Sequence, residues 1–166
     1  MGINLENLFI QSADSAAIAD IVQSRLDGSV AVSQPDWPLP SSFPSIIAKD
    51  LKRKLVISLP DSSWVLVVES NEYVDHGMAR EISERLSCKV VIIVVSEVTG
   101  SAGYLVCEGG KLIEHRFEED SQDPIGLVDK KLRSLGIPFH PFTFSHAIAR
   151  TRNGWISRAI KKAGSA

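Results

Sequence analysis

The residues best suited to chemistry form a short acidic segment between an apolar run, 64–68, and a helix-like segment, 74–86. Ligands of open α/β sheets bind where a strand ends and a helix begins, so this junction is the natural place for a site. Glu69, Asp75 and His76 supply the oxygen and nitrogen atoms that divalent metals bind, and Asp75 and His76 are the candidate catalytic residues. The pattern gives one alternative, a small metal-assisted enzyme.

A simpler interpretation assigns the same segment to local structure. Ser70 or Asn71 can cap the following helix, because a short side-chain oxygen accepts hydrogen bonds from its unpaired backbone amides. The acidic residues complement the positive end of the helix dipole. We favour this interpretation and expect no bound metal and no cofactor. The sequence also lacks a phosphate-binding glycine loop, a Gly-x-Ser-x-Gly elbow, and paired histidines or cysteines at metal-binding spacing.

Two proline-broken segments, 33–45 and 138–144, contain most of the candidates for recognition. Proline lacks a backbone donor and fixes φ, so neither segment fits the interior of a helix or a sheet. Long loops of compact domains often carry function. The alternative for the first segment is a structural strap that closes the edge of the core. The candidate binding residues are Trp37, Phe43, Phe139 and Phe142 of these segments, with the acidic Glu69 and Glu72.

Length and composition are those of one globular domain. The chain has 166 residues, 44% of them hydrophobic and 23% charged, and this length buries a core without disulfides or metals. The first nine residues include Glu6 and no basic residue, which is unlike a signal peptide, and no apolar run is long enough to span a bilayer. Cys88 and Cys107 form neither a metal motif nor a disulfide framework. We therefore expect a cytoplasmic protein that does not bind membranes.

Charge is distributed unevenly along the chain. Residues 1–128 contain 10 basic and 19 acidic residues, a net charge of −9, whereas residues 129–166 contain 8 basic residues and 1 acidic residue, a net charge of +7. A helix predicted over 152–163 has an apolar side that includes Trp155 and Ile156, so we expect it to pack on the acidic body or on a second copy rather than to bind nucleic acid. Nucleic-acid binding is the further alternative, through phosphate contacts of Arg150, Arg152, Arg158, Lys161 and Lys162.

The predicted core of the fold is the segment 64–117. The first apolar run, 64–68, is followed by a helix over 74–86, a second apolar run, 89–95, and a hairpin over 104–117. Every position of the second run after the first is apolar, which indicates a strand buried on both faces. Such a strand needs cover on both faces of its sheet, and the second face would be covered by the helix predicted at 124–135 or by a partner subunit.

Two finer predictions concern this core. Ile92 lies in the middle of the doubly apolar strand and is predicted to be buried. The turn at Gly109 and Gly110 fixes the hairpin register, because paired glycines accept the positive φ of a two-residue turn. This register pairs Glu108 with Lys111, Cys107 with Leu112, Val106 with Ile113 and Tyr104 with His115.

The remaining patterns complete an α+β fold. Strands are predicted at 8–11, 30–32 and 55–58, and helices at 14–26, 45–52 and 124–135, the last beginning at Asp123-Pro124 and stopped by Gly136. We predict a mixed β-sheet of about six or seven strands, with strand-helix-strand units. The helices over 14–26 and 74–86 share one face, and the C-terminal helices lie on the opposite face or along an edge. One domain, 1–166, would contain an N-terminal unit (1–63), the core (64–120) and the C-terminal helices (121–166).

These observations favour a small cytosolic protein-binding module that acts through protein–protein contacts in an inhibitor-, immunity- or adaptor-like role. Another protein is the expected partner, and a homo-oligomer is an alternative arrangement. The absence of catalytic motifs favours binding over catalysis. The metal-assisted enzyme and the nucleic-acid binding protein are retained as alternatives.

Overall fold

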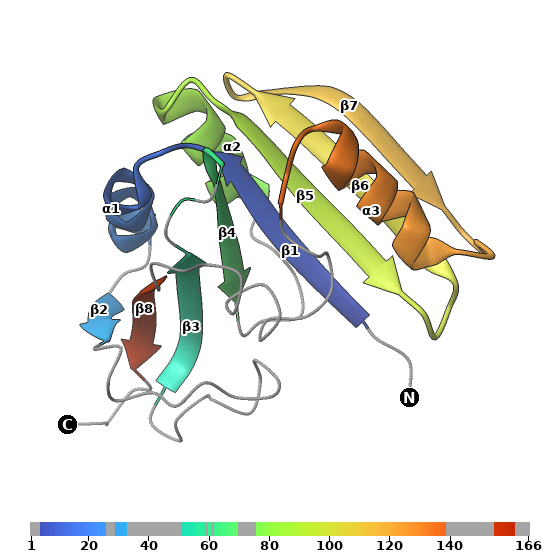
Figure 1. Ribbon diagram of the computed structural model, residues 1–166. Coiled ribbons are helices and arrows are strands. Elements are labelled where there is room, and N and C mark those ends of the chain that lie inside the picture. Colours follow the sequence, from blue (N-terminus) through green and yellow to red (C-terminus); the bar gives the residue numbers. More distant parts are fainter. Residues whose placement is uncertain are drawn as a thin grey trace.

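We describe a computed structural model of the protein for residues 4–25, 29–32, 51–58, 60, 62–69, 76–138 and 155–161. These residues form one antiparallel β-sheet with helices packed on both faces (Figure 1). The predicted α+β class is therefore confirmed. None of the described helices is both long and apolar enough to cross a membrane.

Eight strands and three helices lie within the described ranges. The strands are β1 Asn4–Gln11, β2 Ser29–Val32, β3 Leu51–Ser58, β4 Trp64–Glu69, β5 Lys89–Ser96, β6 Ser101–Glu108, β7 Lys111–Glu118 and β8 Trp155–Lys161. The helices are α1 Ser15–Arg25, α2 His76–Arg85 and α3 Pro124–Ser134. The order of the strands in the sheet is β2-β8-β3-β4-β1-β5-β6-β7, against about six or seven strands predicted.

All strand pairings in the described sheet are antiparallel, so the predicted mixed sheet is wrong. The prediction treated β4, α2 and β5 as a crossover between neighbouring parallel strands. β4 and β5 do run in the same direction, but β1 lies between them and pairs antiparallel with each. Local periodicity identifies the crossover and does not reveal that a strand from the N-terminus is inserted into it.

Strand β5 contributes to two hydrophobic cores, one on each face of the sheet. Ile93 packs in the core beneath α3, together with Phe9 and Leu132. Ile92 packs in the core beneath α1 and α2, together with Ile82. The doubly apolar sequence of β5 is explained by this arrangement, because residues 90–93 and Val95 are buried, with members on both faces of the strand.

Helix α3 begins and ends at the signals expected from the sequence. The Asp123 carboxylate accepts a hydrogen bond from the backbone N–H of Gly126 at 3.0 Å, and a proline occupies the first turn. Gly136 has a φ of 72°, and the N–H of Ile137 donates to the carbonyl of Leu132 at 3.0 Å, which is a Schellman ending. Ile137 is itself buried in the core beneath α3, so the end of the helix is fixed to the sheet.

Two segments predicted as helix are strands. The segment predicted as a helix over 152–163 contains β8, which pairs with both β2 and β3. Leu51 and Lys52, predicted to end a helix over 45–52, instead begin β3, and residues 45–50 lie outside the described part. Short apolar runs fit both periodicities, and pairing with strands distant in sequence decides between them.

The β6–β7 hairpin keeps the predicted register only beside its turn. A β-bulge makes Ile113 an extra residue of β7, and the pairing beyond it shifts by one residue. The predicted register assumed an unbroken ladder. Glu108 pairs with Lys111 and Cys107 with Leu112 as predicted, whereas Val106 pairs with Glu114, not Ile113, and Tyr104 with Arg116, not His115.

Truncation of Ile92 to Ala should lower the free energy of unfolding by about 2–5 kcal/mol, because the side chain is 4% exposed in the core beneath α1 and α2. Val98→Ala is the matched control, since Val98 is 68% exposed, and it should change the value by less than about 0.5 kcal/mol. Urea denaturation of the two variants measures both effects. An unchanged unfolding midpoint for Ile92→Ala would contradict this placement.

Candidate functional site

Most residues singled out by the sequence lie outside the described part of the structure, and their roles stay predictions. Glu69 is the last residue of β4, and His76 is the exposed first residue of α2. Within the described ranges, no three His, Cys, Asp or Glu side chains converge on a position that could hold a metal ion. The residues outside these ranges are Trp37, Phe43, Phe139, Phe142, Glu72 and Asp75.

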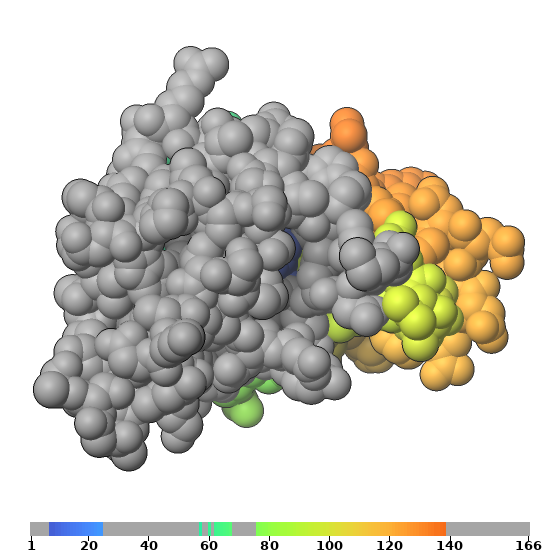
Figure 2. All heavy atoms as spheres, turned by 90° about the horizontal axis from the view of Figure 1, so that it is seen from below, coloured from blue at the N-terminus to red at the C-terminus, as the bar shows by residue number. Residues whose placement is uncertain are grey.

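The surface that the described residues do define is the outer edge of the sheet at β7. β7 is the last strand in the sheet order, and none of the described strands pairs with its outer edge. Every residue of β7 from Lys111 to Phe117 is exposed. Figure 1 shows β7 at the margin of the sheet, and Figure 2 shows the hairpin and α3, coloured yellow to orange, gathered at one end of the molecule. An edge of this kind presents unpaired backbone N–H and C=O groups.

Apolar side chains are concentrated on this strand. Leu112, Ile113 and Phe117 are 54%, 53% and 57% exposed, and with Val98 they are the large exposed hydrophobic residues of the described structure. The ring of Phe117 lies over Gly103 of β6, where an added Cβ would come within 2.9 Å of the ring atom Cδ2. The glycine therefore leaves room for the aromatic ring on the outer strand.

Helix α2 holds the turn between β6 and β7 in place. The buried Ser83 hydroxyl donates to the carbonyl of Cys88 at 2.9 Å and accepts from the N–H of Gly110 at 3.1 Å. Arg80 Nε donates to the Gly110 carbonyl at 3.0 Å. Gly110 has a φ of 80°, and a Cβ there would lie 3.0 Å from Cβ of Glu84, so glycine is required for two reasons. These contacts set the orientation of β7.

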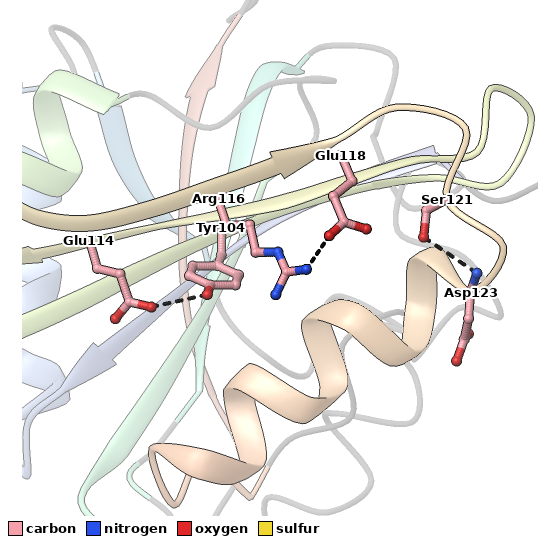
Figure 3. A network of polar contacts seen from close by, with 6 residues as sticks. All are labelled: Tyr104, Glu114, Arg116, Glu118, Ser121 and Asp123. Atoms are coloured by element: carbon pink, nitrogen blue, oxygen red, sulfur yellow. Dashed lines mark hydrogen bonds and ion pairs between the residues drawn. The ribbon is translucent and has the colours of Figure 1, made fainter.

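A row of polar side chains lines the face of the hairpin that meets α3 (Figure 3). The Tyr104 hydroxyl donates to Glu114 Oε1 at 3.0 Å, and Lys131 Nζ of α3 donates to Glu114 Oε2 at 2.6 Å. Lys131 Nζ also lies 5.2 Å from the centre of the Tyr104 ring, within the range of a cation–π contact. Arg116 and Glu118 form an ion pair further along β7. The charged side chains of β7 on this face are thus held in place and alternate in sign.

These contacts shift two pKa values in opposite directions. Burial raises the pKa of Tyr104, and the hydrogen bond to the Glu114 carboxylate raises it further. The hydrogen bond from Lys131 lowers the pKa of Glu114, and the hydrogen bond from Tyr104 lowers it as well. At neutral pH the tyrosine is protonated and the carboxylate is ionised, an arrangement that joins β7 to α3 and does not favour proton transfer between the two groups.

The cysteines do not supply a nucleophile. Cys88 and Cys107 are both free thiols. Burial raises the pKa of Cys88 to about 11, and burial also raises the pKa of Cys107 above its ordinary value. Both thiols are therefore protonated at neutral pH, and the thiolate is the reactive form.

The sequence contains a signal for this edge that the sequence-based interpretation did not use. Leu112 and Ile113 are adjacent apolar residues in a strand that is otherwise mostly polar, and a bulge accommodates one extra residue at this position. After the hairpin the next predicted element is the helix at 124–135, so no strand follows directly to cover β7. The missing information was the order of the sheet, which local patterns do not contain.

Comparisons with known proteins identify no relative of this chain. No protein-family model matches it, and no curated protein and no solved structure matches it either. The geometry described above is therefore the basis for a functional assignment.

Replacing Glu114 with Gln should lower the pKa of Tyr104, because the neutral amide no longer opposes the negative charge of the phenolate. The measurement is an ultraviolet titration in a Tyr73→Phe background, which leaves Tyr104 as the only tyrosine. Glu119→Gln removes a carboxylate outside this network and should leave the pKa of Tyr104 unchanged. Equal Tyr104 pKa values with Glu and with Gln at position 114 would contradict the observed contact.

Proposed function

We propose that this protein is a small protein-binding module, inhibitor-, immunity- or adaptor-like, that binds an extended segment of another protein along β7. One observation carries the proposal: β7 is an eight-residue strand at the end of the sheet order, exposed from Lys111 to Phe117. An extended segment added to such an edge satisfies backbone donors and acceptors that otherwise bind water. This mode of binding requires no cofactor and no catalytic group.

The side chains of β7 would give this binding its specificity. In antiparallel pairing, side chains directly opposite one another lie about 4.5–5.5 Å apart at Cβ and interact in pairs. Ile113 and Phe117 offer apolar contacts, whereas Glu114 and Arg116 offer charges of opposite sign. A partner segment with apolar residues and complementary charges at matching positions would be favoured over others.

The surroundings of β7 support the proposal because they hold the strand in one position before a partner arrives. Ser83 and Arg80 of α2 anchor the hairpin turn, and Lys131 of α3 anchors Glu114. A strand ordered in advance loses less conformational entropy on binding than a mobile segment would.

Two features of β7 also occur on edge strands that avoid pairing, namely a bulge and charged side chains. The bulge lies at Ile113, near the turn, and leaves residues 114–118 in regular register with β6. The charges alternate in sign, so they exclude mismatched segments and favour a complementary one. These features restrict the set of partners and leave the edge available for pairing.

The predicted binding residues outside this strand are retained as proposed additional contacts. The proline-broken segments and the acidic segment could extend the interface, and they rest on sequence alone. None of the described residues favours the metal-assisted enzyme or the nucleic-acid alternative. The proposed additional contact residues are Trp37, Phe43, Phe139, Phe142, Glu69 and Glu72.

The proposal is tested with peptides selected from a display library of random extended sequences against sparsely immobilised protein. The selected peptides should bind the wild-type protein, and Phe117→Lys should weaken that binding by at least about tenfold, because a lysine on the edge opposes apolar pairing. Val98→Lys is the matched control, since Val98 is also exposed and lies outside β7, and it should bind like wild type. Fluorescence anisotropy with labelled peptides gives the affinities.

A second measurement identifies strand addition directly. Single N-methyl groups placed along a selected peptide should abolish binding at every second residue, because alternate amides face the paired strand. Binding that Phe117→Lys leaves intact, or N-methyl effects without a two-residue period, would rule out strand addition at β7.

A further inference from the structure

We propose that the strand added to β7 is β7 of a second copy of this chain, so that two sheets join into one across a two-fold axis. The inference rests on the proposed function, because it names the partner for the same edge. A second copy as partner corresponds to the homo-oligomer, which was the alternative arrangement expected from the sequence.

The two ends of the described sheet differ in length. β2 at one end has four residues, whereas β7 at the other end has eight. A very short edge strand is one of the ways in which proteins avoid pairing with copies of themselves. β7 is long enough to form a ladder, and it carries exposed apolar residues that β-pairing would cover.

Symmetry limits the ways in which β7 can pair with itself. The two-fold axis of an antiparallel pair stands perpendicular to the sheet, so each side chain stays on the same face in both copies. Because successive side chains alternate between faces on the far side of the bulge, directly opposite residues there must differ by an even number or be the same residue. The axis therefore passes through one residue of β7, and each choice of that residue defines a register.

Charge selects among these registers. With the axis at His115, Glu114 lies opposite Arg116 of the second copy, and the reverse pair follows by symmetry. With the axis at Glu114 or at Arg116, that charge faces itself, which is destabilising. An axis at Phe117 also pairs opposite charges, but it aligns only residues 116–118 of β7.

The register centred on His115 also matches the apolar residues. It places Ile113 opposite Phe117 of the second copy, and the symmetry repeats this contact. Both side chains are more than half exposed in the single chain, and pairing would remove apolar surface from water at two positions. The ladder then extends from residue 113 to residue 117, and it stops there because the bulge leaves Leu112 and Glu118 on opposite faces of the sheet.

The contacts within one chain are compatible with this pairing. Glu114 accepts hydrogen bonds from Tyr104 and Lys131, and a carboxylate has about four acceptor positions, so two remain for a second Arg116. Arg116 pairs with Glu118 and has five N–H donors in all. The ion pairs between copies therefore add to the existing network without dismantling it.

The test is sedimentation equilibrium of the full chain over a range of concentrations. The wild-type protein should form dimers, and Glu114→Arg and Arg116→Glu should each weaken dimer formation by at least tenfold, because like charges then face each other across the axis. An equimolar mixture of the two variants should form mixed dimers. The double variant E114R/R116E restores opposite charges between the copies and should dimerise more strongly than either single variant, although it loses the contacts with Lys131 and Glu118 within each chain. Glu119→Arg makes the same charge change outside β7 and should have no effect.

These outcomes separate a wrong partner from a wrong function. A loss of folding cannot imitate the expected pattern, because the mixture and the double variant must regain association. A monomeric wild-type protein, or single variants that dimerise normally, would overturn the second copy as partner, and binding of display-selected peptides to β7 would then still support the proposed function. If those peptides also fail to bind, both the second copy as partner and the proposed binding function of β7 are wrong.

Discussion

The constraint on which the structure depends is that β5 must be covered on both faces. Its apolar residues alternate between two cores, with Ile93 beneath α3 and Ile92 beneath α1 and α2. Exposure of either face to water would cost about 25 cal/mol for each Å² of apolar surface. Helices α2 and α3 therefore pack on opposite faces of β5 and β6, whereas α1 packs on β3 and β8. β7 follows β6 as the last strand of the described sheet, so its outer edge lies beyond this cover.

The exposed edge is nevertheless a defined surface. Ser83 links α2 to the hairpin turn, and the Schellman ending of α3 fixes that helix through the buried Ile137. Lys131 of α3 then reaches Glu114 of β7. Two helices on opposite faces of the sheet thus hold the same hairpin, so the outer strand keeps the geometry of the sheet although its own side chains are exposed. A surface that is exposed and fixed in this way suits binding to an extended partner.

Sequence reasoning identified the elements with strong local signals and missed those set by pairing between distant segments. The two-sided burial of β5, the cap at Asp123 and the stop at Gly136 are local properties, and each is observed. The insertion of β1 between β4 and β5 depends on residues more than 50 positions away, and so does the placement of residues 155–161 as a strand between β2 and β3. The one-residue bulge at Ile113 shifted the predicted register for a similar reason, because packing of the hairpin decides it.

The candidate site was harder to predict than the fold. The candidates chosen from the sequence were titratable groups and aromatic loops. An edge strand is identified instead by the lack of a pairing strand on one of its sides. No residue type by itself identifies an unpaired edge strand, so the order of the strands in the sheet must be known first. The expectation of a protein-binding module, drawn from the lack of catalytic motifs, stays a prediction that the proposal retains.

The most direct test is residue-resolved hydrogen exchange of the backbone amides of β7, measured by nuclear magnetic resonance in dilute and in concentrated protein. Pairing of β7 with a second strand predicts that exchange slows with concentration at alternate residues between 113 and 117, where the amides face outward. The amides of β6, already paired on both sides, should keep the same rates. Exchange rates along β7 that are the same at both concentrations would contradict the account.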